Sequence, residues 1–600
     1  MPSPATCRLA DLPAQIAAQH AAIARFETAL WQGGFKAHLL ASYQAAWRRL
    51  EALLAQHGEG RRRHHFVIVI PVADSPIHLQ DCLRSLLELC RAYGYGGMQD
   101  GRWRKVSVLL ADDSSDAGCI ERNRAIAAEF DRAGLCTDYF GLDEQLALLD
   151  KLAGLDLTPI VGQHARTAFG HKGQAMMRNI AYLKCAELHA RMSATSPDEK
   201  VLFYTIDADQ EFKVNVEPPA ATGGRVVANE VCAVNFLYHL DAIFSRSDAL
   251  VLTGKVVGDP PVSPAVMAGN FLEDVIGFLH EMAARAPEQP YPQPDAAGAH
   301  GQSRDAAYHD MADLFGFKPA AAAYRYRCTL PGEPDNAACF AEFSTRLNRF
   351  FHGEHPTRVT WFEPSDAAAS VQPARTVYTG NYVFRPDALG WFIPYAPLRL
   401  RMSGPTMGRL LQAEIGSRFV SANVPMLHKR TLDATGQSEF RPGVVDASAH
   451  IDLCGEFERQ FHGDVMLFSM QRLTALGYPD ASLAASVVDA TLAAVQAEMR
   501  ETYRDKQRAI LARLDHLQTL LHDAAHWWQR TPGLAGAVAN FESFAGNIAH
   551  NFGAASACIA RLDDPARRSD WRARQLAALT GLHANRQAWA QALAVLQAPD

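Results

Sequence analysis

Acidic residues follow three separate apolar runs of the sequence. The runs VIVIPVAD, VSVLLADDSSD and VLFYTIDADQEF carry Asp74, then Asp112 and Asp113, then Asp207 and Asp209. Side chains at positions i and i+2 of an extended chain point to the same face, so Asp207 and Asp209 should repel one another. A cation or hydrogen-bond donors must compensate them. Divalent cations prefer oxygen ligands and often bridge substrate phosphates, so this pattern predicts a metal and phosphate site.

The segments around these acids indicate how they are positioned. Each run is short, rich in β-branched residues and apolar throughout, which is typical of a strand buried on both faces of a parallel sheet. Residues 79–90 and 120–130 carry apolar side chains at helical spacing between the runs. Strands that alternate with helices predict an α/β fold with a mainly parallel sheet. Ligands of such sheets bind beyond the carboxyl ends of the strands, which is where the acids lie.

The composition excludes several classes of protein. The chain has 600 residues, of which 48% are hydrophobic and 20% charged, so disorder and collagen are excluded. Its net charge of −7 provides no bulk positive field for nucleic acid. The 11 cysteines form no C-x-x-C pair, which argues against zinc ribbons and a disulfide scaffold and suits a reducing cytosol. With no secretory signal in residues 1–19 and no bilayer-spanning apolar run, we expect a cytoplasmic protein.

The chain divides into three predicted parts. Residues 1–60 are expected to be helical, because large apolar side chains recur at spacings near three, four or seven. Residues 61–445 are expected to hold the α/β domain, with an insertion at about 281–372 whose Pro-rich stretch 285–305 is interpreted as a loop. Residues 446–600 show helical spacing throughout and predict an all-helical domain.

Four motifs in order carry a family resemblance. VIVIPVAD, LLADDSSD, GHKGQAMMRN and YTIDADQEF resemble those of a nucleotide-sugar glycosyltransferase with the GT-A fold, and are most similar to the family-two-like branch. The resemblance runs from about residue 66 to about residue 430. It implies a Rossmann-like core and a hexosyltransferase activity that moves a sugar from a nucleoside-diphosphate-sugar donor to a hydroxyl acceptor. It also implies a divalent metal cofactor, Mn²⁺ or Mg²⁺.

The resemblance gives individual residues roles. It assigns the donor nucleotide to Pro71, Val72, Ala73, Asp74, Asp113, Lys172, Arg178 and Asp207. Asp113 is similar to the acid that hydrogen-bonds the base, and Lys172 or Arg178 is expected near the diphosphate. Asp209 resembles the metal ligand of the D-x-D motif, and His428 lies where many GT-A enzymes place a further ligand. An imidazole beside carboxylates and phosphate oxygens suits either metal.

The sequence departs from the family pattern on the acceptor side. Gly380, Asn381 and Thr406 resemble the stretch that lines the sugar and the acceptor. Inverting members carry an acid after this stretch that deprotonates the acceptor, but no carboxylate lies between Asp387 and Glu414. Asp387 or Glu414 could reach the site, a base could come from the insertion, or the enzyme could be retaining and need none. The missing acid favours retention.

Other interpretations stay open. A nucleotidyltransferase that makes a nucleotide-sugar would share the sheet and the metal acids, but it needs a basic, Gly-rich loop after the first strand, where this chain has VADSPIHLQD. A non-catalytic nucleotide-sugar-binding scaffold is the third possibility. The terminal helices could form a homo-oligomer, bind a protein acceptor or lie on a membrane surface. We interpret Arg61–Arg63 as a solvated linker, and His352, Glu354 and His355 as surface residues.

Overall fold

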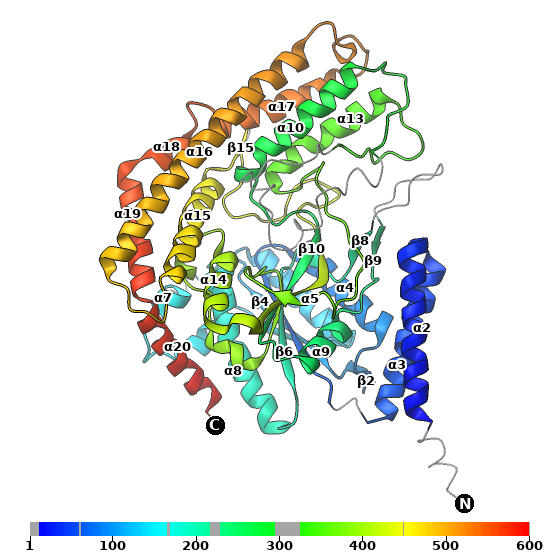
Figure 1. The fold of residues 1–600 in the computed structure, drawn as a ribbon, viewed down its shortest axis with the longest axis vertical. Coiled ribbons are helices and arrows are strands. Elements are labelled where there is room, and N and C mark those ends of the chain that lie inside the picture. Colours follow the sequence, from blue (N-terminus) through cyan, green and yellow to red (C-terminus); the bar gives the residue numbers. More distant parts are fainter. Residues whose placement is uncertain are drawn as a thin grey trace, which may run out of the picture.

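A sheet of nine strands forms the centre of the structure (Figure 1). The computed structural model describes residues 11–58, 62–164, 169–216, 229–294, 325–447 and 449–598. The strand order is β11-β13-β10-β12-β6-β1-β4-β5, with β7 paired to β13. The strands are β1 (His65–Val72), β4 (Val106–Asp112), β5 (Cys136–Phe140), β6 (Val201–Ile206), β7 (Gln210–Glu211), β10 (Val251–Gly258), β11 (Gln372–Pro373), β12 (Asn381–Phe384) and β13 (Phe419–His428).

Most strands of this sheet are parallel. β1 pairs in parallel with β4 and β6, and β4 with β5. β12 runs antiparallel to both β6 and β10, and β13 is again parallel to β10. The predicted α/β fold with a mainly parallel sheet is therefore confirmed, and β12 inserts one reversed strand near its middle.

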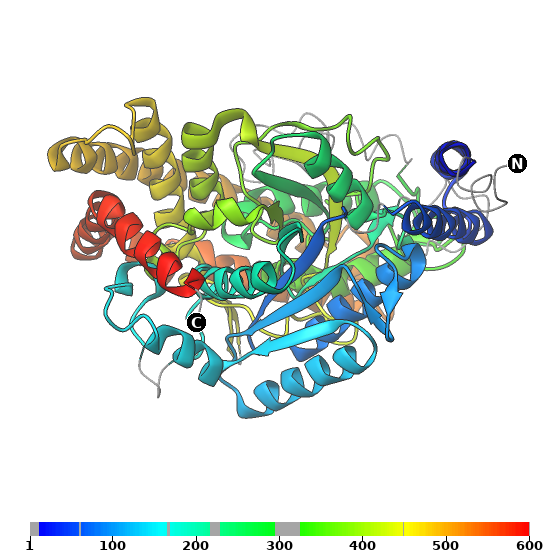
Figure 2. The ribbon, with the colours of Figure 1, turned by 90° about the horizontal axis from the view of Figure 1, so that it is seen from below.

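Helices cover both faces of the sheet, as the view from below shows (Figure 2). Along β1, Val67 and Val69 belong to one hydrophobic cluster, whereas Ile68 and Ile70 belong to the other. The first cluster is covered by α8 (Gln174–Thr195), α10 (Pro264–Ala283) and C-terminal helices. The second is covered by α3 (Ala37–Gln56), α4 (Pro76–Tyr93), α5 (Ala117–Arg132) and α9 (Phe236–Arg246). Burial on both faces explains why these strands are apolar throughout.

The described N-terminal residues form a helical hairpin of α2 (Leu12–Gly33) and α3. Trp47 and Leu50 of α3 are buried against the second cluster. Arg63 corrects the interpretation of a solvated linker, because it is buried and its Nε donates to Asp241 Oδ2 at 2.6 Å. Its guanidinium also lies 4.4 Å from the centre of the Tyr95 ring. This arginine ties the start of the sheet to α9.

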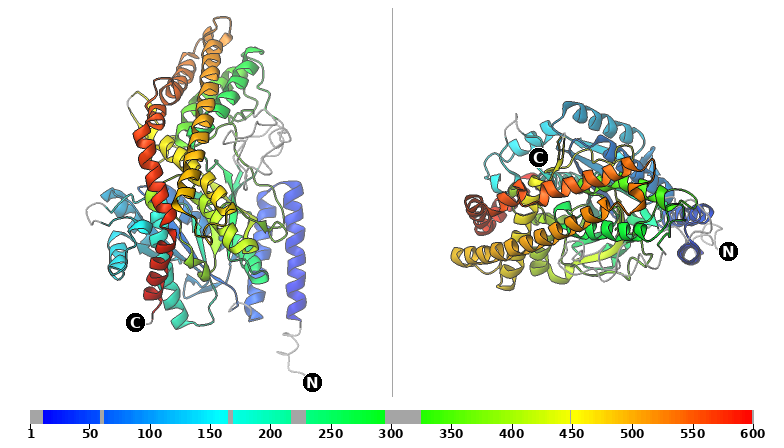
Figure 3. Two further views of the ribbon diagram at one scale, coloured as in Figure 1. Left: turned by 60° about the vertical axis from the view of Figure 1, so that its left-hand side comes forward. Right: turned by 90° about the horizontal axis from the view of Figure 1, so that it is seen from above.

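The central insertion and the C-terminal helices lie side by side (Figure 3). α10 packs against α16 and α13 against α17, and both pairs belong to the same cluster as one face of the sheet. His352, Glu354 and His355 are buried in this region, which corrects their interpretation as surface residues. Residues 295–305 of the Pro-rich stretch lie outside the described residues. The helices are α13 (Asn336–Arg346), α14 (Ser403–Ile415), α15 (Cys454–Ala475), α16 (Ala485–His522), α17 (Ala535–Phe552), α18 (Ala557–Asp563), α19 (Pro565–Thr580) and α20 (Leu582–Gln597).

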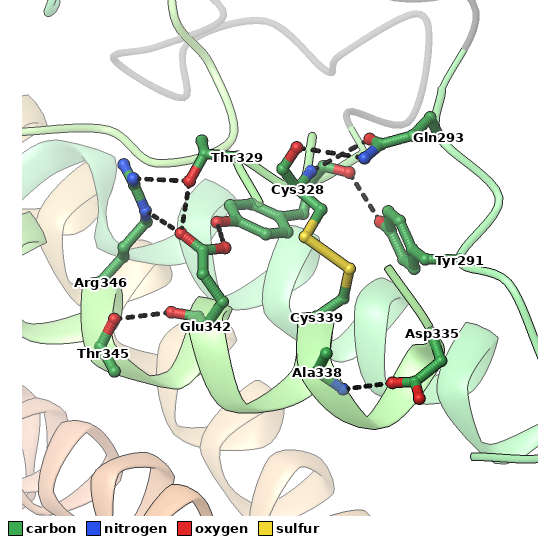
Figure 4. Close-up of a disulfide and its surroundings, with 11 residues drawn as sticks. Tyr291, Gln293, Cys328, Thr329, Asp335, Ala338, Cys339, Glu342, Thr345 and Arg346 are labelled. Carbon is green, nitrogen blue, oxygen red and sulfur yellow. Dashed lines mark hydrogen bonds and ion pairs between the residues drawn. A yellow bond between two sulfur atoms is a disulfide. The ribbon is translucent and has the colours of Figure 1, made fainter. Parts of the chain in front are cut away.

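Two disulfides stabilise this helical region. Cys328 pairs with Cys339 at the start of α13, and Cys454 pairs with Cys558 of α18. Figure 4 shows the first pair, with Gln293 hydrogen-bonded to the backbone of Cys328. The expectation of reduced cysteines is wrong for these four residues, because pairing depends on the tertiary fold. No helix among the described ranges has the length and apolarity that a membrane span requires.

Candidate active site

The carboxyl ends of the parallel strands meet at one edge of the sheet. The strands that run toward this edge are β1, β4, β6, β10 and β13. β12 lies between β6 and β10 and is antiparallel to both, so β10 and β13 have the same direction as β6. The edge therefore brings together Ala73, Asp113, Asp207, Asp259 and His428. Sequence reasoning placed four of these five residues at the site. Asp259 was missed, because it follows a strand outside the four recognised motifs.

Two cavities open at this edge and adjoin one another. The first, of about 420 Å³, is lined by Pro71, Val72, Ala73 and Asp113. The second, of about 510 Å³, is lined by Gly380 and by Ser403 and Gly404 of α14. The lining that the two share consists of Gly173, Gln174 and Asp207, together with Arg399, Arg401, Arg430 and Arg459. Five of the predicted nucleotide residues thus line the first cavity, and Gly380, of the predicted acceptor residues, lines the second.

Asp209 and His428 form a pair at the junction of the cavities. His428 Nε2 lies 3.3 Å from Asp209 Oδ2, and Arg430 Nη1 lies 3.0 Å from the same oxygen. Burial raises the pKa of Asp209, but His428 and Arg430 outweigh it and lower that pKa well below its usual range. Asp209 is therefore a carboxylate at neutral pH.

The hydrogen bonds of this pair suit a metal ligand set. His428 Nδ1 lies 2.7 Å from the carbonyl oxygen of Asp259, which can only accept, so Nδ1 carries a proton and Nε2, which faces Asp209, is the nitrogen that would bind a metal in place of a proton. Asp209 Oδ1 is buried with no hydrogen-bond partner among the described residues. The described ranges contain no group of three or more potential ligands. Two protein ligands with substrate phosphates and water are sufficient for Mg²⁺-like ions, so these residues fit the implied metal.

Asp207, the first acid of the D-x-D motif, is held by α8. Its Oδ1 accepts a hydrogen bond from Gln174 Nε2 at 2.7 Å and pairs with the guanidinium of Arg178. A Cβ atom at Gly380 would lie 2.7 Å from Asp207 Oδ2, so only glycine lets the chain before β12 approach so closely. Arg178 therefore forms an ion pair with Asp207, and both residues line the second cavity.

Three of the predicted nucleotide contacts are engaged within the protein. The Asp113 carboxylate accepts hydrogen bonds from the backbone of Lys172 and Gly173 at 3.0 and 3.1 Å. Lys172 Nζ lies 2.6 Å from Asp113 and donates to the carbonyl of Phe169 at 2.7 Å. Asp74 pairs with His171 at 2.5 Å. These contacts hold the turn before α8 against the first strand loop.

An arginine cluster, which sequence reasoning missed, surrounds the shared wall. Glu456 of α15 is fully buried, and three arginines lie 3.5 to 3.6 Å from its oxygens. Burial raises the pKa of Glu456, but these arginines outweigh it and hold it at about 2. The members of the cluster are Arg399, Arg401, Arg430, Arg441 and Arg459. They come from separate segments, so no local motif could have revealed them.

The charges of this cluster are crowded. Burial, and then Arg430 beside it, lower the pKa of Arg441 to about 9. Burial likewise lowers the pKa of Arg459, and Arg401 and Arg399 add to this effect. An anion bound among these side chains would relieve their repulsion, and diphosphate is a strong acceptor of such charge-assisted hydrogen bonds.

Backbone strain gathers at the same place. Asp74, His171, Arg399 and Met402 have φ values of 45°, 50°, 52° and 64°, in the left-handed region that non-glycine residues rarely adopt. Three of them line the cavities, and Asp74 pairs with His171. Strained residues of this kind cluster at functional sites.

Four predicted residues lie away from the cavities. Asp387 follows β12, whose reversed direction carries it beyond the opposite edge of the sheet, where its side chain is exposed. Glu414 forms a two-pronged ion pair with Arg586 of α20 and accepts from Trp391 Nε1 at 2.7 Å. The Asn381 amide is buried and bonds to Tyr204 and to two backbone carbonyls, and Thr406 is buried within α14. The structure therefore brings neither candidate base to the site.

Comparisons with known proteins include a match to a solved structure. No protein-family model and no curated protein matches the chain. Among solved structures, the chain is similar to the mannosyltransferase PcManGT from Pyrobaculum calidifontis in complex with GDP-Man and Mn²⁺. The sequence identity is 10%, the match covers 92% of this chain and 97% of that chain, and the TM-score is 0.30. A TM-score of this size is too low for comparing the two sites.

Proposed function

We propose that the protein is a metal-dependent glycosyltransferase that transfers a sugar from a nucleoside-diphosphate-sugar donor to a hydroxyl acceptor. The observation that carries this proposal is the meeting of two cavities over Asp207, Asp209 and the arginine cluster. The first cavity, which the loop after β1 lines, would bind the nucleotide, and the second cavity would hold the sugar and the acceptor. The arginines lie in the wall that the two cavities share, where the negative charge of a leaving diphosphate would develop.

The chain's own residues have distinct tasks in this proposal. Arg399, Arg401 and Arg459 neutralise the diphosphate as its bond to the sugar breaks. Asp209 and His428 would hold Mn²⁺ or Mg²⁺, and the bound metal would stabilise charge on the diphosphate oxygens. Arg178 and Gln174 fix Asp207 at the boundary with the second cavity. Donor and acceptor are thereby held on two sides of one charged wall.

The proposal is tested by binding and by turnover. Nucleoside diphosphates and nucleotide-sugars are screened by thermal shift with and without Mn²⁺, because a ligand of the folded state stabilises it by about 2.7 kcal/mol at 100 times its Kd. We expect stabilisation by a subset of these nucleotides, and slow donor hydrolysis without acceptor. A screen in which no nucleoside diphosphate stabilises the protein would contradict the proposal.

Replacing His428 with alanine should weaken the use of metal. The imidazole is one of two groups that would hold it, so we expect the Mn²⁺ concentration for half-maximal donor hydrolysis to rise about 10- to 100-fold, with partial recovery at high Mn²⁺. The measurement is a Mn²⁺ titration of wild type and variant. Replacement of the exposed His522 by alanine is the control. Equal titration curves would mean that His428 has only a structural role.

The acceptor side supports a retaining mechanism. Among the described residues that line the second cavity, Asp207 is the one carboxylate, and Arg178 and Gln174 already bind it. In a retaining reaction the sugar–phosphate bond breaks, the acceptor oxygen bonds to the same carbon on the same face, and its proton passes to the departing phosphate oxygen. No protein base is needed for that transfer.

We therefore expect the product to keep the anomeric configuration of the donor. Proton NMR of the fresh product reads this configuration from the coupling constant of the anomeric proton, provided that the sugar is gluco- or galacto-configured. An inverted product would require a base that reaches the cavity from elsewhere, and it would rule out the direct proton transfer to phosphate.

A further inference from the structure

His78 lies in the wall of the first cavity, at the start of α4. It is the third residue of that helix, is 8% exposed, and lines the cavity together with Ser75, which precedes the helix. Burying an ionisable ring is costly unless its polar atoms are hydrogen-bonded. The two nitrogens of this ring differ in that respect.

Glu439 fixes one of the two ring nitrogens. His78 Nδ1 lies 2.8 Å from Glu439 Oε2, and the same carboxylate accepts hydrogen bonds from the backbone nitrogens of Ile77 and His78 at 3.0 and 2.8 Å. A carboxylate accepts hydrogen bonds, so Nδ1 carries a proton. Glu439 belongs to the segment between β13 and α15 that also contributes Phe440 and Arg441 to the cavity wall. The imidazole is therefore held in one orientation from outside its own helix.

The other ring nitrogen lacks a partner. His78 Nε2 is buried and has no hydrogen-bond partner among the residues that the structure describes. Burial lowers the pKa of His78, but the hydrogen bond to Glu439 outweighs it and the charge of Asp209 adds to this effect, so that pKa lies above its usual value. A ring that readily takes a second proton offers Nε2–H as a donor. A buried polar atom without a partner is costly, so an acceptor atom of a ligand would be favourable here.

The surroundings of His78 indicate which kind of acceptor this is. The charges of His78 and Asp209 lie near enough to shift each other's pKa. Because the described part of the chain holds no group of three or more potential metal ligands, His78 does not join Asp209 and His428 as a third ligand. A metal held by Asp209 would bind diphosphate oxygens, and the diphosphate would then also lie near His78. Phosphate oxygens form strong hydrogen bonds with charged N–H donors.

We propose that His78 is a phosphate-binding residue of the donor site, that its Nε2–H donates to the diphosphate, and that Glu439 positions it. This inference rests on the proposed function, because it takes the first cavity as the nucleotide site. The imidazole then lies between two anions, the Glu439 carboxylate and the diphosphate. This contact comes from α4, whereas the arginine cluster follows β12 in the chain.

The test starts with two ligands of the wild-type protein. Calorimetric titration with the nucleoside diphosphate that stabilises it best, with Mg²⁺ present, examines the proposed function alone. Pyrophosphate is then titrated in the same buffer at constant ionic strength, because it carries the phosphates without the base and the ribose. Both titrations are repeated for each variant, and thermal unfolding of the same samples shows whether the fold is intact.

Two variants of His78 separate its ring nitrogens. In His78→Asn the amide can donate to Glu439 as Nδ1 does, but no atom takes the place of Nε2. In His78→Gln the longer side chain brings an amide donor near the place of Nε2 and gives up the bond to Glu439. We expect the Kd of both ligands to rise about tenfold or more in His78→Asn, and less in His78→Gln. His522→Asn, at an exposed histidine that pairs with Glu542, is the matched control and should bind as wild type does.

Two results would overturn the phosphate contact while leaving the proposed function standing. One is pyrophosphate that fails to bind wild type or that binds His78→Asn equally well; weakening of the nucleoside diphosphate alone would then mean that the ring contacts the ribose or the base. The other is a smaller loss in His78→Asn than in His78→Gln, because the bond to Glu439 and not Nε2 would then be what matters. Failure of the nucleoside diphosphate to bind wild type would instead contradict the proposed function itself.

Discussion

Asp209→Asn is expected to abolish nearly all donor turnover while the protein stays folded. The asparagine keeps the size of the side chain but removes the charge that His428 and Arg430 face at 3.3 and 3.0 Å. It also removes one of the two groups that would hold the metal. Loss of a single group that stabilises developing charge typically costs about 10²–10³ in kcat, and we expect at least that loss.

Two measurements distinguish this effect from unfolding. Donor hydrolysis is followed by release of nucleoside diphosphate, and thermal unfolding is recorded on the same samples. Asp433→Asn is the control, because Asp433 is exposed and lies on the loop that follows Arg430, so it changes net charge equally without touching the site. If Asp209→Asn retains turnover within about threefold of wild type, the D-x-D motif is not catalytic; if the melting transition disappears, Asp209 is structural.

The strands and their acids could be predicted because the signal is local. A buried parallel strand is apolar throughout, and the residue after it lies at the carboxyl edge whatever the rest of the fold does. Ala73, Asp113, Asp207 and His428 were therefore expected at one edge, and the structure places them there. Strands that are apolar throughout must be buried on both faces, so helices on both faces of the sheet could also be predicted.

Strand direction could not be predicted in the same way. Asp387 was a candidate base because it follows the sugar-lining stretch, but β12 runs antiparallel to both of its neighbours and carries this residue to the far edge. Glu414 was a candidate because it is the next acid along the chain, yet Arg586 of the last helix holds it. Both errors arise from pairings between distant segments.

The arginine cluster could not be predicted either, because its members come from distant segments of the chain. Arg399 and Arg401 lie before α14, Arg430 after β13, and Arg441 and Arg459 on either side of the start of α15. In the sequence, each of these arginines by itself is typical of a charged residue on the protein surface. Their common feature is Glu456, a buried carboxylate that becomes informative only once three guanidinium groups are seen around it.

Glu456→Gln is expected to destabilise the fold strongly. The carboxylate is fully buried, and its loss leaves Arg401, Arg441 and Arg459 without their shared counter-ion. Removing one partner of a buried ion pair typically costs about 3–5 kcal/mol, because the remaining charge stays buried and unpaired. The pKa of Glu456 falls from 4.5 to about 2 in the folded protein, so its contribution is complete above pH 4.5 and is lost as the pH falls through about 2.

Bound anions should restore much of the thermal stability that Glu456→Gln loses. With Glu456 neutral the cluster carries one more uncompensated positive charge, so pyrophosphate is expected to raise the melting temperature of Glu456→Gln more than that of wild type at neutral pH. Glu498→Gln is the control, because Glu498 forms an exposed pair with Arg472 and such pairs contribute about 0–1 kcal/mol. Calorimetry of the three proteins with and without pyrophosphate makes the comparison. A Glu456→Gln protein that melts with wild type would mean that the arginines do not depend on this carboxylate, and a lower melting temperature that pyrophosphate leaves unchanged would mean that the cluster is not an anion site.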